Sequence, residues 1–316
     1  MKKFVSYGYA AGIILFVSLL IVAFSCFDRI YIWYLGDVPS RYAKALSDYS
    51  SRRYEDARKE FSSLARIDSA CYAQYLLGDM YYRGLGGEQD YRKAMSWFVR
   101  SSSRGNMDAQ NNVAFMYAYG HGVEPDYAKA RRHFSAAASQ GNPEAQLGLG
   151  TMYRHGWGIQ RSYHDALDWY RRSAAHGNSD AMNNIGYMYY NGLGTSMNAE
   201  TAYYWFNKSA SCDNPVAQYN LGVLYSSGRG VERDLQKSAE WLSKSASQGH
   251  VFAQYNLGRM YYWGKGVEKD HHKAEMYYRL SAWKGHKRAQ KALEEMEQDI
   301  PAEETDSVFT MELMAD

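Results

Sequence analysis

The chain has 316 residues, with 36 lysines and arginines, 34 aspartates and glutamates and a formal net charge of +2. The charge is uneven, because residues 292–316 hold nine acids and no lysine or arginine, which leaves 36 bases against 25 acids on the remainder. These bases are scattered along expected helices, as at Arg131 and Arg171, and no recognition helix or aromatic RNA-binding motif accompanies them. The pattern therefore argues against a nucleic-acid partner.

The N-terminal stretch predicts a membrane anchor. Residues 1–3 include two lysines, and residues 4–27 carry no charge. A helix of that length rises ~1.5 Å per residue and spans the ~30 Å hydrocarbon core with some tilt. We expect a short cytoplasmic N-terminus at 1–3, a transmembrane signal-anchor at 4–27 in the bacterial inner membrane, and the rest of the chain in the periplasm. A cleaved signal peptide ending at Ser25 and a lipoprotein acylated on Cys26 stay open as alternatives.

Residues 28–72 read as a juxtamembrane segment followed by a degenerate helical unit. We expect helices over 41–49 and 54–67, because Ala57, Phe61 and Ala65 recur at helical spacing. This unit would cap the N-terminal end of the structure that follows.

Residues 73–288 form six rows of 36 residues without insertion or deletion, and a fixed period of this length indicates stacked supersecondary units. The first column is alanine in every row: Ala73, Ala109, Ala145, Ala181, Ala217 and Ala253. Cys71 and Cys212 lie about four rows apart, so a bridge between them would exceed the ~7 Å limit on the Cα separation.

Each row predicts two helices. Columns 1, 5, 8 and 9 are apolar at helical spacing, and column 6 is a glycine in five rows, which indicates a close helix crossing. Two glycines at columns 12 and 14 end the first helix. The residue at column 18 is suited to cap a second helix, which stops near column 33. The six expected caps are Asp90, Asp126, Ser162, Asn198, Asp234 and Asp270.

The C-terminal part divides in two. Residues 289–300 read as a capping helix with a charged outer side, as the end of a stack requires. Residues 301–316 are acidic, and we expect a disordered tail there. Docking on the body of the protein stays open as an alternative, because four apolar residues form a short patch within this tail, at Val308, Phe309, Met311 and Leu313.

The row pattern A-x-x-x-L-G-x-x-Y-x-x-G-x-G-V-x-x-D-x-x-K-A-x-x-W resembles the Sel-1-like repeat, a relative of the tetratricopeptide repeat. The resemblance extends over residues 73–286. It implies an all-α fold, a right-handed α-solenoid of helix-turn-helix repeats, and an adaptor that binds other proteins. It also implies a tetratricopeptide-like cap at 28–72.

The candidate binding surface lies on the first helices, at the columns that point away from the apolar face. In the related repeats the equivalent face lines a concave groove, where asparagines and bases hold peptide groups. Asparagine both donates and accepts, and tyrosine suits interfaces. An alternative is that the column-4 asparagines satisfy backbone groups between repeats. The candidate residues are Tyr75, Asn112, Arg154, Asn184, Tyr187, Tyr190, Tyr219, Asn220, Tyr255, Asn256, Arg259 and Tyr262.

The expected function is a membrane-anchored scaffold that binds a protein or peptide partner on the concave surface, without catalysis, cofactor or metal. The six Gly-x-Gly loops lack the lysine and the preceding strand of a phosphate loop. No pair of histidines has metal-ligand spacing, and no nucleophile is paired with a base. Two alternatives stay open: an immunity protein that neutralises an envelope-acting effector, because some such proteins resemble tethered solenoids of this type, and a cell-envelope hydrolase.

Overall fold

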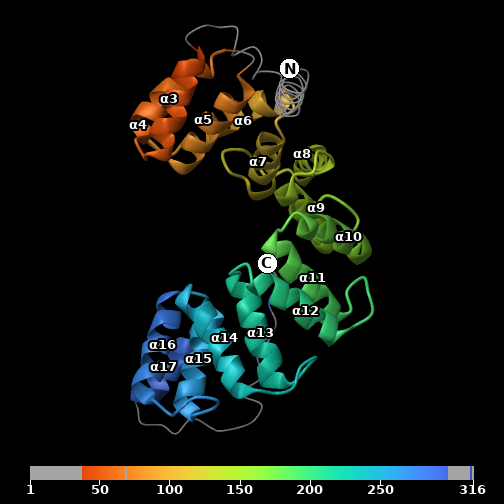
Figure 1. Cartoon of the computed structure of the whole chain (residues 1–316), viewed down its shortest axis with the longest axis vertical. Helices are drawn as coiled ribbons and strands as arrows, with labels where there is room; N and C mark the ends of the chain where they lie inside the picture. The colour runs from red at the N-terminus through yellow and green to blue at the C-terminus, as the bar shows by residue number, and fades with distance from the viewer. Residues whose placement is uncertain (1–37, 68–69, 298–313, 315–316) are drawn as a thin grey trace, which may run out of the picture. The chain divides into compact units, whose positions relative to one another are not determined.

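The computed structural model describes residues 38–67, 70–297 and 314. This part of the chain contains α-helices, labelled α3 to α17, and no strand (Figure 1). The expected all-α repeat fold is confirmed, while the right-handed sense of the stack stays a prediction. No helix within the described ranges is long and apolar enough to cross a membrane. The expected anchor at 4–27 and its flank at 1–3 lie outside the described residues.

Each row of the sequence forms one helical hairpin, as predicted. The first helices of the six hairpins are α5 (Cys71–Arg83), α7 (Met107–Tyr119), α9 (Pro143–His155), α11 (Ser179–Asn191), α13 (Pro215–Ser227) and α15 (Val251–Trp263). The second helices are α6 (Tyr91–Ser103), α8 (Tyr127–Ser139), α10 (Tyr163–Ala175), α12 (Ala199–Ala210), α14 (Leu235–Ser247) and α16 (His271–Trp283). The chain divides into two compact units, residues 1–160 and 161–316.

The predicted helix caps are confirmed. At all six column-18 positions the side chain accepts a hydrogen bond from the backbone N–H three residues later. Asp234, for example, accepts from the Lys237 N–H at 2.9 Å. An asparagine also caps four of the first helices, and His250 takes that place on α15. These caps fix where each helix begins, because they satisfy backbone donors that the helix leaves without partners.

The helical glycines mark close packing within a hairpin. A Cβ placed on Gly222 of α13 would lie 2.8 Å from Leu242 Cγ of α14. The loop glycine Gly230 has φ +73° and lies against the Ala199 carbonyl at the start of the preceding second helix. A side chain is therefore excluded at both positions, as the expected close crossing requires.

Buried serines on four of the second helices tie their hairpins together. Ser245 of α14 donates its hydroxyl to the Pro215 carbonyl of α13 at 2.6 Å, and Ser209 of α12 donates to the Ser179 carbonyl of α11 at 2.7 Å. Ser101 and Ser281 make the equivalent bonds 30 residues back along the chain. The sequence reading did not anticipate these bonds.

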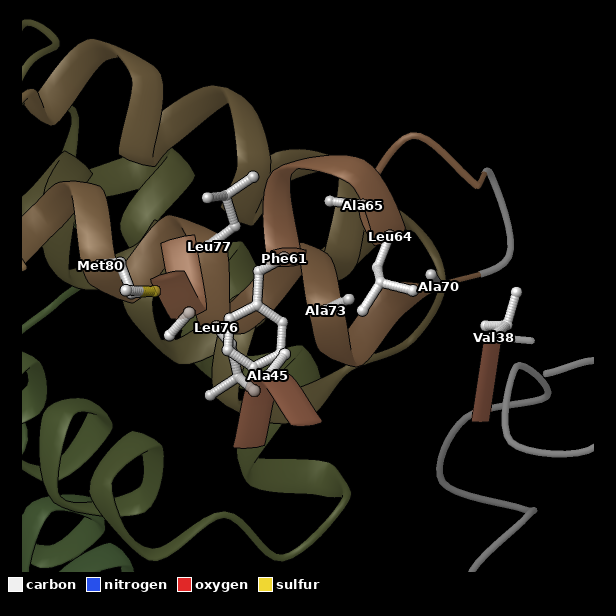
Figure 2. Close-up of a cluster of buried hydrophobic side chains, with 11 residues drawn as sticks. Val38, Ala45, Phe61, Leu64, Ala65, Ala70, Ala73, Leu76, Leu77 and Met80 are labelled. Carbon is white, nitrogen blue, oxygen red and sulfur yellow. The ribbon is translucent and has the colours of Figure 1, made fainter. Parts of the chain in front are cut away.

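Helices at both ends cover the repeats. α3 (Val38–Ser50) and α4 (Tyr54–Leu64) form the N-terminal hairpin. α3 begins three residues earlier than the predicted helix over 41–49, and α4 ends three residues earlier than the predicted helix over 54–67. Figure 2 shows Phe61 of α4 among the apolar side chains that this hairpin shares with α5. α17 (Lys287–Glu297) follows the last repeat and packs on α16. Cys71 is disulfide-bonded, whereas Cys212 is exposed and free.

Candidate binding surface

Three first helices of the second unit, α11, α13 and α15, present polar side chains at equivalent positions. We call this surface the α11–α13–α15 face and define it by Asn183, Tyr219, Asn220, Val223, Asn256 and Arg259. The first of these residues lies on α11, the next three on α13 and the last two on α15. The 36-residue period brings column 3 of one repeat next to column 4 of the following repeat.

Asn220 lies at the centre of this face and binds a distant part of the chain. Its Oδ1 accepts from the Met314 N–H at 2.7 Å, and its Nδ2 donates to the Met314 carbonyl at 2.6 Å. The same Nδ2 donates to Asn183 Oδ1 at 2.8 Å, and Asn183 Nδ2 donates to the Met314 carbonyl at 3.3 Å. Two asparagines from neighbouring repeats therefore bind the backbone of Met314, through both its N–H and its C=O.

Met314 is also held by apolar contacts. It packs against a hydrophobic cluster to which Tyr219 and Val223 of α13 belong. The expectation of a disordered tail over 301–316 does not hold at Met314, because hydrogen bonds and packing fix this residue on α13. Its neighbours in the sequence lie outside the described residues.

A second polar contact repeats the pattern one hairpin further on. Asn256 Nδ2 donates to the Tyr219 hydroxyl at 3.3 Å, and Arg259 Nη1 donates to Asn256 Oδ1 at 3.5 Å. Arg259 is only 5% exposed, and burial lowers the pKa of its guanidinium. Arginine nevertheless keeps its proton in proteins, so this end of the face carries a buried positive charge.

Three of the predicted site residues line a pocket next to Arg259. The pocket is small and partly open to solvent. Tyr255, Arg259, Tyr262 and Trp263 line it from α15, and Glu295 lines it from α17. Aromatic rings beside a guanidinium and a carboxylate suit a side chain that is partly apolar and partly polar.

The remaining predicted residues of the second unit lie on α11. Asn184 is fully buried, and Tyr187 and Tyr190 are half-buried against the cluster between α12 and α13. The Tyr190 hydroxyl accepts from Arg229 Nη1 at 2.8 Å. The neighbouring column-3 residue Asn183, rather than Asn184, makes the described contacts with Asn220 and Met314.

The first unit holds the other three predicted residues. Tyr75 is half-buried against Phe98, and burial raises the pKa of its hydroxyl. Asn112 is half-buried on α7, and Arg154 of α9 contacts the His155 ring. The structure therefore gathers six predicted residues into the α11–α13–α15 face and its pocket: Tyr219, Asn220, Tyr255, Asn256, Arg259 and Tyr262.

Sequence reasoning missed Asn183, Val223 and Met314. Its alternative explanation for the column-4 asparagines also does not describe the bonds made by Asn220 and Asn256. These bonds go to the side chains of the preceding repeat and to Met314, not to helix backbone between repeats. The interacting side chains are 37 residues apart, one more than the repeat period, as in Asn183 with Asn220 and Tyr219 with Asn256. Pairing column 3 of one repeat with column 4 of the next would therefore have identified them from the sequence.

Comparison with known proteins identifies the repeats. A family model described as Sel1 repeat matches residues 71–106, 108–142, 143–178, 179–214, 215–250 and 251–286. The chain is similar to the structure of c5321, a protective antigen of uropathogenic Escherichia coli strains with an SLR fold (32% identity, TM-score 0.67, covering 78% of this chain and 53% of that one). It thus spans about half the length of that protein. A Sel1 repeat protein from Oxalobacter formigenes is similar to the same degree (32% identity, TM-score 0.68, covering 77% of this chain and 70% of that one).

More distant solved structures add nothing on function. The immunity protein Pa5087 of Pseudomonas aeruginosa is 22% identical with a TM-score of 0.48, and the alignment covers 65% of this chain and 81% of that one. At this distance the likeness carries no argument about a shared role. The comparison with curated proteins found no match.

Proposed function

Because the chain belongs to the Sel1 repeat family, we propose that it is a non-enzymatic scaffold that binds an extended segment of a partner protein on the α11–α13–α15 face. Repeat scaffolds of stacked helical hairpins offer elongated surfaces of this kind. No group of three or more histidine, cysteine, aspartate and glutamate side chains lies close enough to hold a metal within the described ranges.

The paired hydrogen bond between Asn220 and Met314 is the observation that carries this proposal. A carboxamide offers one acceptor and two donors, so it complements the N–H and the C=O of one residue at once. Such recognition reads the peptide backbone and leaves the choice of sequence to neighbouring side-chain contacts. The apolar cluster around Tyr219 and the Arg259 pocket supply those contacts.

We also propose that residues 4–27 anchor this scaffold in the bacterial inner membrane and that the repeats lie in the periplasm. The length of the uncharged stretch and the lysines before it support this location. Alkaline phosphatase fused after residue 37 reports the orientation, because it is active only outside the cytoplasm. An inactive fusion of normal abundance would overturn the proposed topology.

Site-specific photo-crosslinking in cells tests the binding face. A photoreactive residue at Tyr187, Tyr255 or Tyr262, which are half-buried, should yield a discrete adduct. The same residue at Arg131 or Arg171, which are exposed on second helices, should not. Equal labelling from all five positions, or none from Tyr187, Tyr255 and Tyr262, would overturn the proposal.

Mass spectrometry of the adduct then identifies the partner. Several partners that share a segment of similar sequence would match an adaptor. One tightly bound partner would match an inhibitor of a single protein. An adduct with cell-wall material instead of protein would contradict the scaffold and favour a hydrolase.

A further inference from the structure

Met314 occupies the position that the proposed function assigns to a partner. We propose that the α11–α13–α15 face selects an extended acidic peptide with an unbranched apolar residue at its centre, and that the chain's own C-terminal segment around Met314 is a tethered ligand that a partner must displace. This inference rests on the proposed function and specifies both its ligand class and its competition.

The backbone contacts show what the ligand must offer. The backbone N–H and C=O of Met314 both form hydrogen bonds with the Asn220 side chain, with donor–acceptor distances of 2.7 and 2.6 Å. Asn183 adds a second donor to the Met314 carbonyl. A residue within a helix or sheet has already committed these groups, so the ligand has to arrive as a segment with free backbone. Proline at the central position lacks the N–H and cannot bind in this way.

The side-chain contacts define the central residue. Met314 packs against the cluster that includes Tyr219 and Val223, and Val223 is only 1% exposed. Phe115 occupies the column of Val223 on α7 of the first unit and is 38% exposed. The apolar side chain at this column is therefore buried on α13, where Met314 packs, and exposed to solvent on α7. An unbranched side chain such as methionine adapts to a shallow apolar surface of this kind.

Charge favours an acidic ligand. Of the six residues that define the face, Arg259 alone is charged, while Asp180 of α11 and Glu295 of the pocket lie outside that set. In the sequence, Met314 has an acid two residues before it and another two residues after it, Glu312 and Asp316. Residues two apart lie on the same side of an extended segment, so a bound peptide of this sequence can direct acids towards the face.

The tether makes the internal ligand an effective competitor. Sixteen residues separate Glu297, the end of α17, from Met314. A short linker typically gives an effective concentration near the millimolar range. If the isolated peptide binds with a Kd of ~100 μM, the tethered copy weakens an added ligand about tenfold.

A peptide-binding experiment on the purified full chain in mild detergent tests the inference. The probe is a fluorescently labelled peptide of residues 306–316, and the readout is fluorescence polarisation. Met314→Pro in the full chain should strengthen binding of the probe about tenfold, because the tethered copy then loses its N–H and releases the face. Equal affinity of the wild-type and Met314→Pro chains would overturn the proposal.

Three controls make the result specific. A probe with proline in place of Met314 should not bind to either chain. Adding Asn220→Ala to the Met314→Pro chain should weaken binding at least about tenfold, and Asn183→Ala should weaken it less. Both asparagine variants are checked for unchanged helical circular dichroism. Undiminished binding to the folded Asn220→Ala chain would place the peptide elsewhere and overturn the site.

Light scattering separates a tail bound within its own chain from one exchanged between two copies. A wild-type chain that is monomeric, one chain per micelle, supports the tethered ligand. A wild-type dimer that dissociates on Met314→Pro would overturn it. If the probe fails to bind while the crosslinking at Tyr255 and Tyr262 still captures a partner, the proposed function stands and only this inference is lost.

Discussion

Asn220 and Met314 lie 94 positions apart in the sequence and bind each other through both hydrogen-bonding groups of the Met314 backbone. The carboxamide of Asn220 is fully buried in this arrangement. Because the Asn220 amide also donates to Asn183, the contact extends over two adjacent repeats. Met314 is thus held by side chains of two helices of the second unit, α11 and α13.

The strength of this contact can be measured at the Met314 amide. Asn220→Ala should speed hydrogen exchange of that amide about tenfold, since a buried hydrogen bond contributes on the order of 1 kcal/mol. Asn112→Ala, at the same column on α7, is the matched control and should leave the exchange rate at Met314 unchanged. A rate at Met314 that is already that of a free peptide in the wild-type chain would contradict the contact.

The buried serines should contribute to stability. Ser245→Ala removes the 2.6 Å bond to the Pro215 carbonyl and should lower the free energy of unfolding by about 1–2 kcal/mol, because the buried carbonyl loses its donor. Ser247→Ala on the exposed side of the same helix should change it by less than about 0.5 kcal/mol. Urea titrations followed by circular dichroism provide the comparison. Equal effects of the two substitutions would show that the bond to Pro215 does not stabilise the hairpin.

The helix crossing at Gly222 should not tolerate a methyl group. Alanine favours helices over glycine by about 1 kcal/mol, yet a Cβ at this position would lie 2.8 Å from Leu242 Cγ and 3.3 Å from the Ser238 carbonyl. We expect Gly222→Ala to lower the melting temperature, with a net loss of about 1–3 kcal/mol from overpacking. Gln236→Ala, on the exposed side of α14, is the control. A stabilised Gly222→Ala variant would mean that the two helices can separate at little cost.

The histidine cap of α15 should make stability depend on pH. Burial, and then the nearby Lys284 ammonium, lower the pKa of His250 from 6.5 to about 4. Below pH 6.5 the unfolded chain therefore binds a proton that the folded chain does not take up until about pH 4. The contribution of His250 is complete above pH 6.5 and decreases by on the order of 3 kcal/mol as the pH falls to about 4.

Asparagine caps four of the other first helices, so His250→Asn keeps a cap and removes the titrating group. The free energy of unfolding of this variant should fall less steeply between pH 6.5 and 4. His164→Asn, on an exposed position of α10, is the control and should keep the wild-type slope. Identical slopes for the wild-type chain and His250→Asn would refute the assignment.

The sequence by itself determined the repeat and its local geometry. The 36-residue period, the column-18 caps and the glycines at columns 6, 12 and 14 depend on contacts within one hairpin or with the next one. Such contacts recur in every repeat, so six copies of the same pattern identify them. Asp234 as a cap and Gly222 as a crossing point are both local features of this kind.

Only the tertiary structure decided which residues of the binding surface act together. The period placed Asn220 on the exposed side of its helix, but it could not show that Asn183 rather than Asn184 is its partner, because adjacent columns differ by one residue. It could not indicate Met314, which is not among the four residues of the apolar patch found in the tail. The contact between Met314 and Asn220 joins a segment without a period to one position of the repeat, and a contact that occurs once leaves no periodic trace in the sequence.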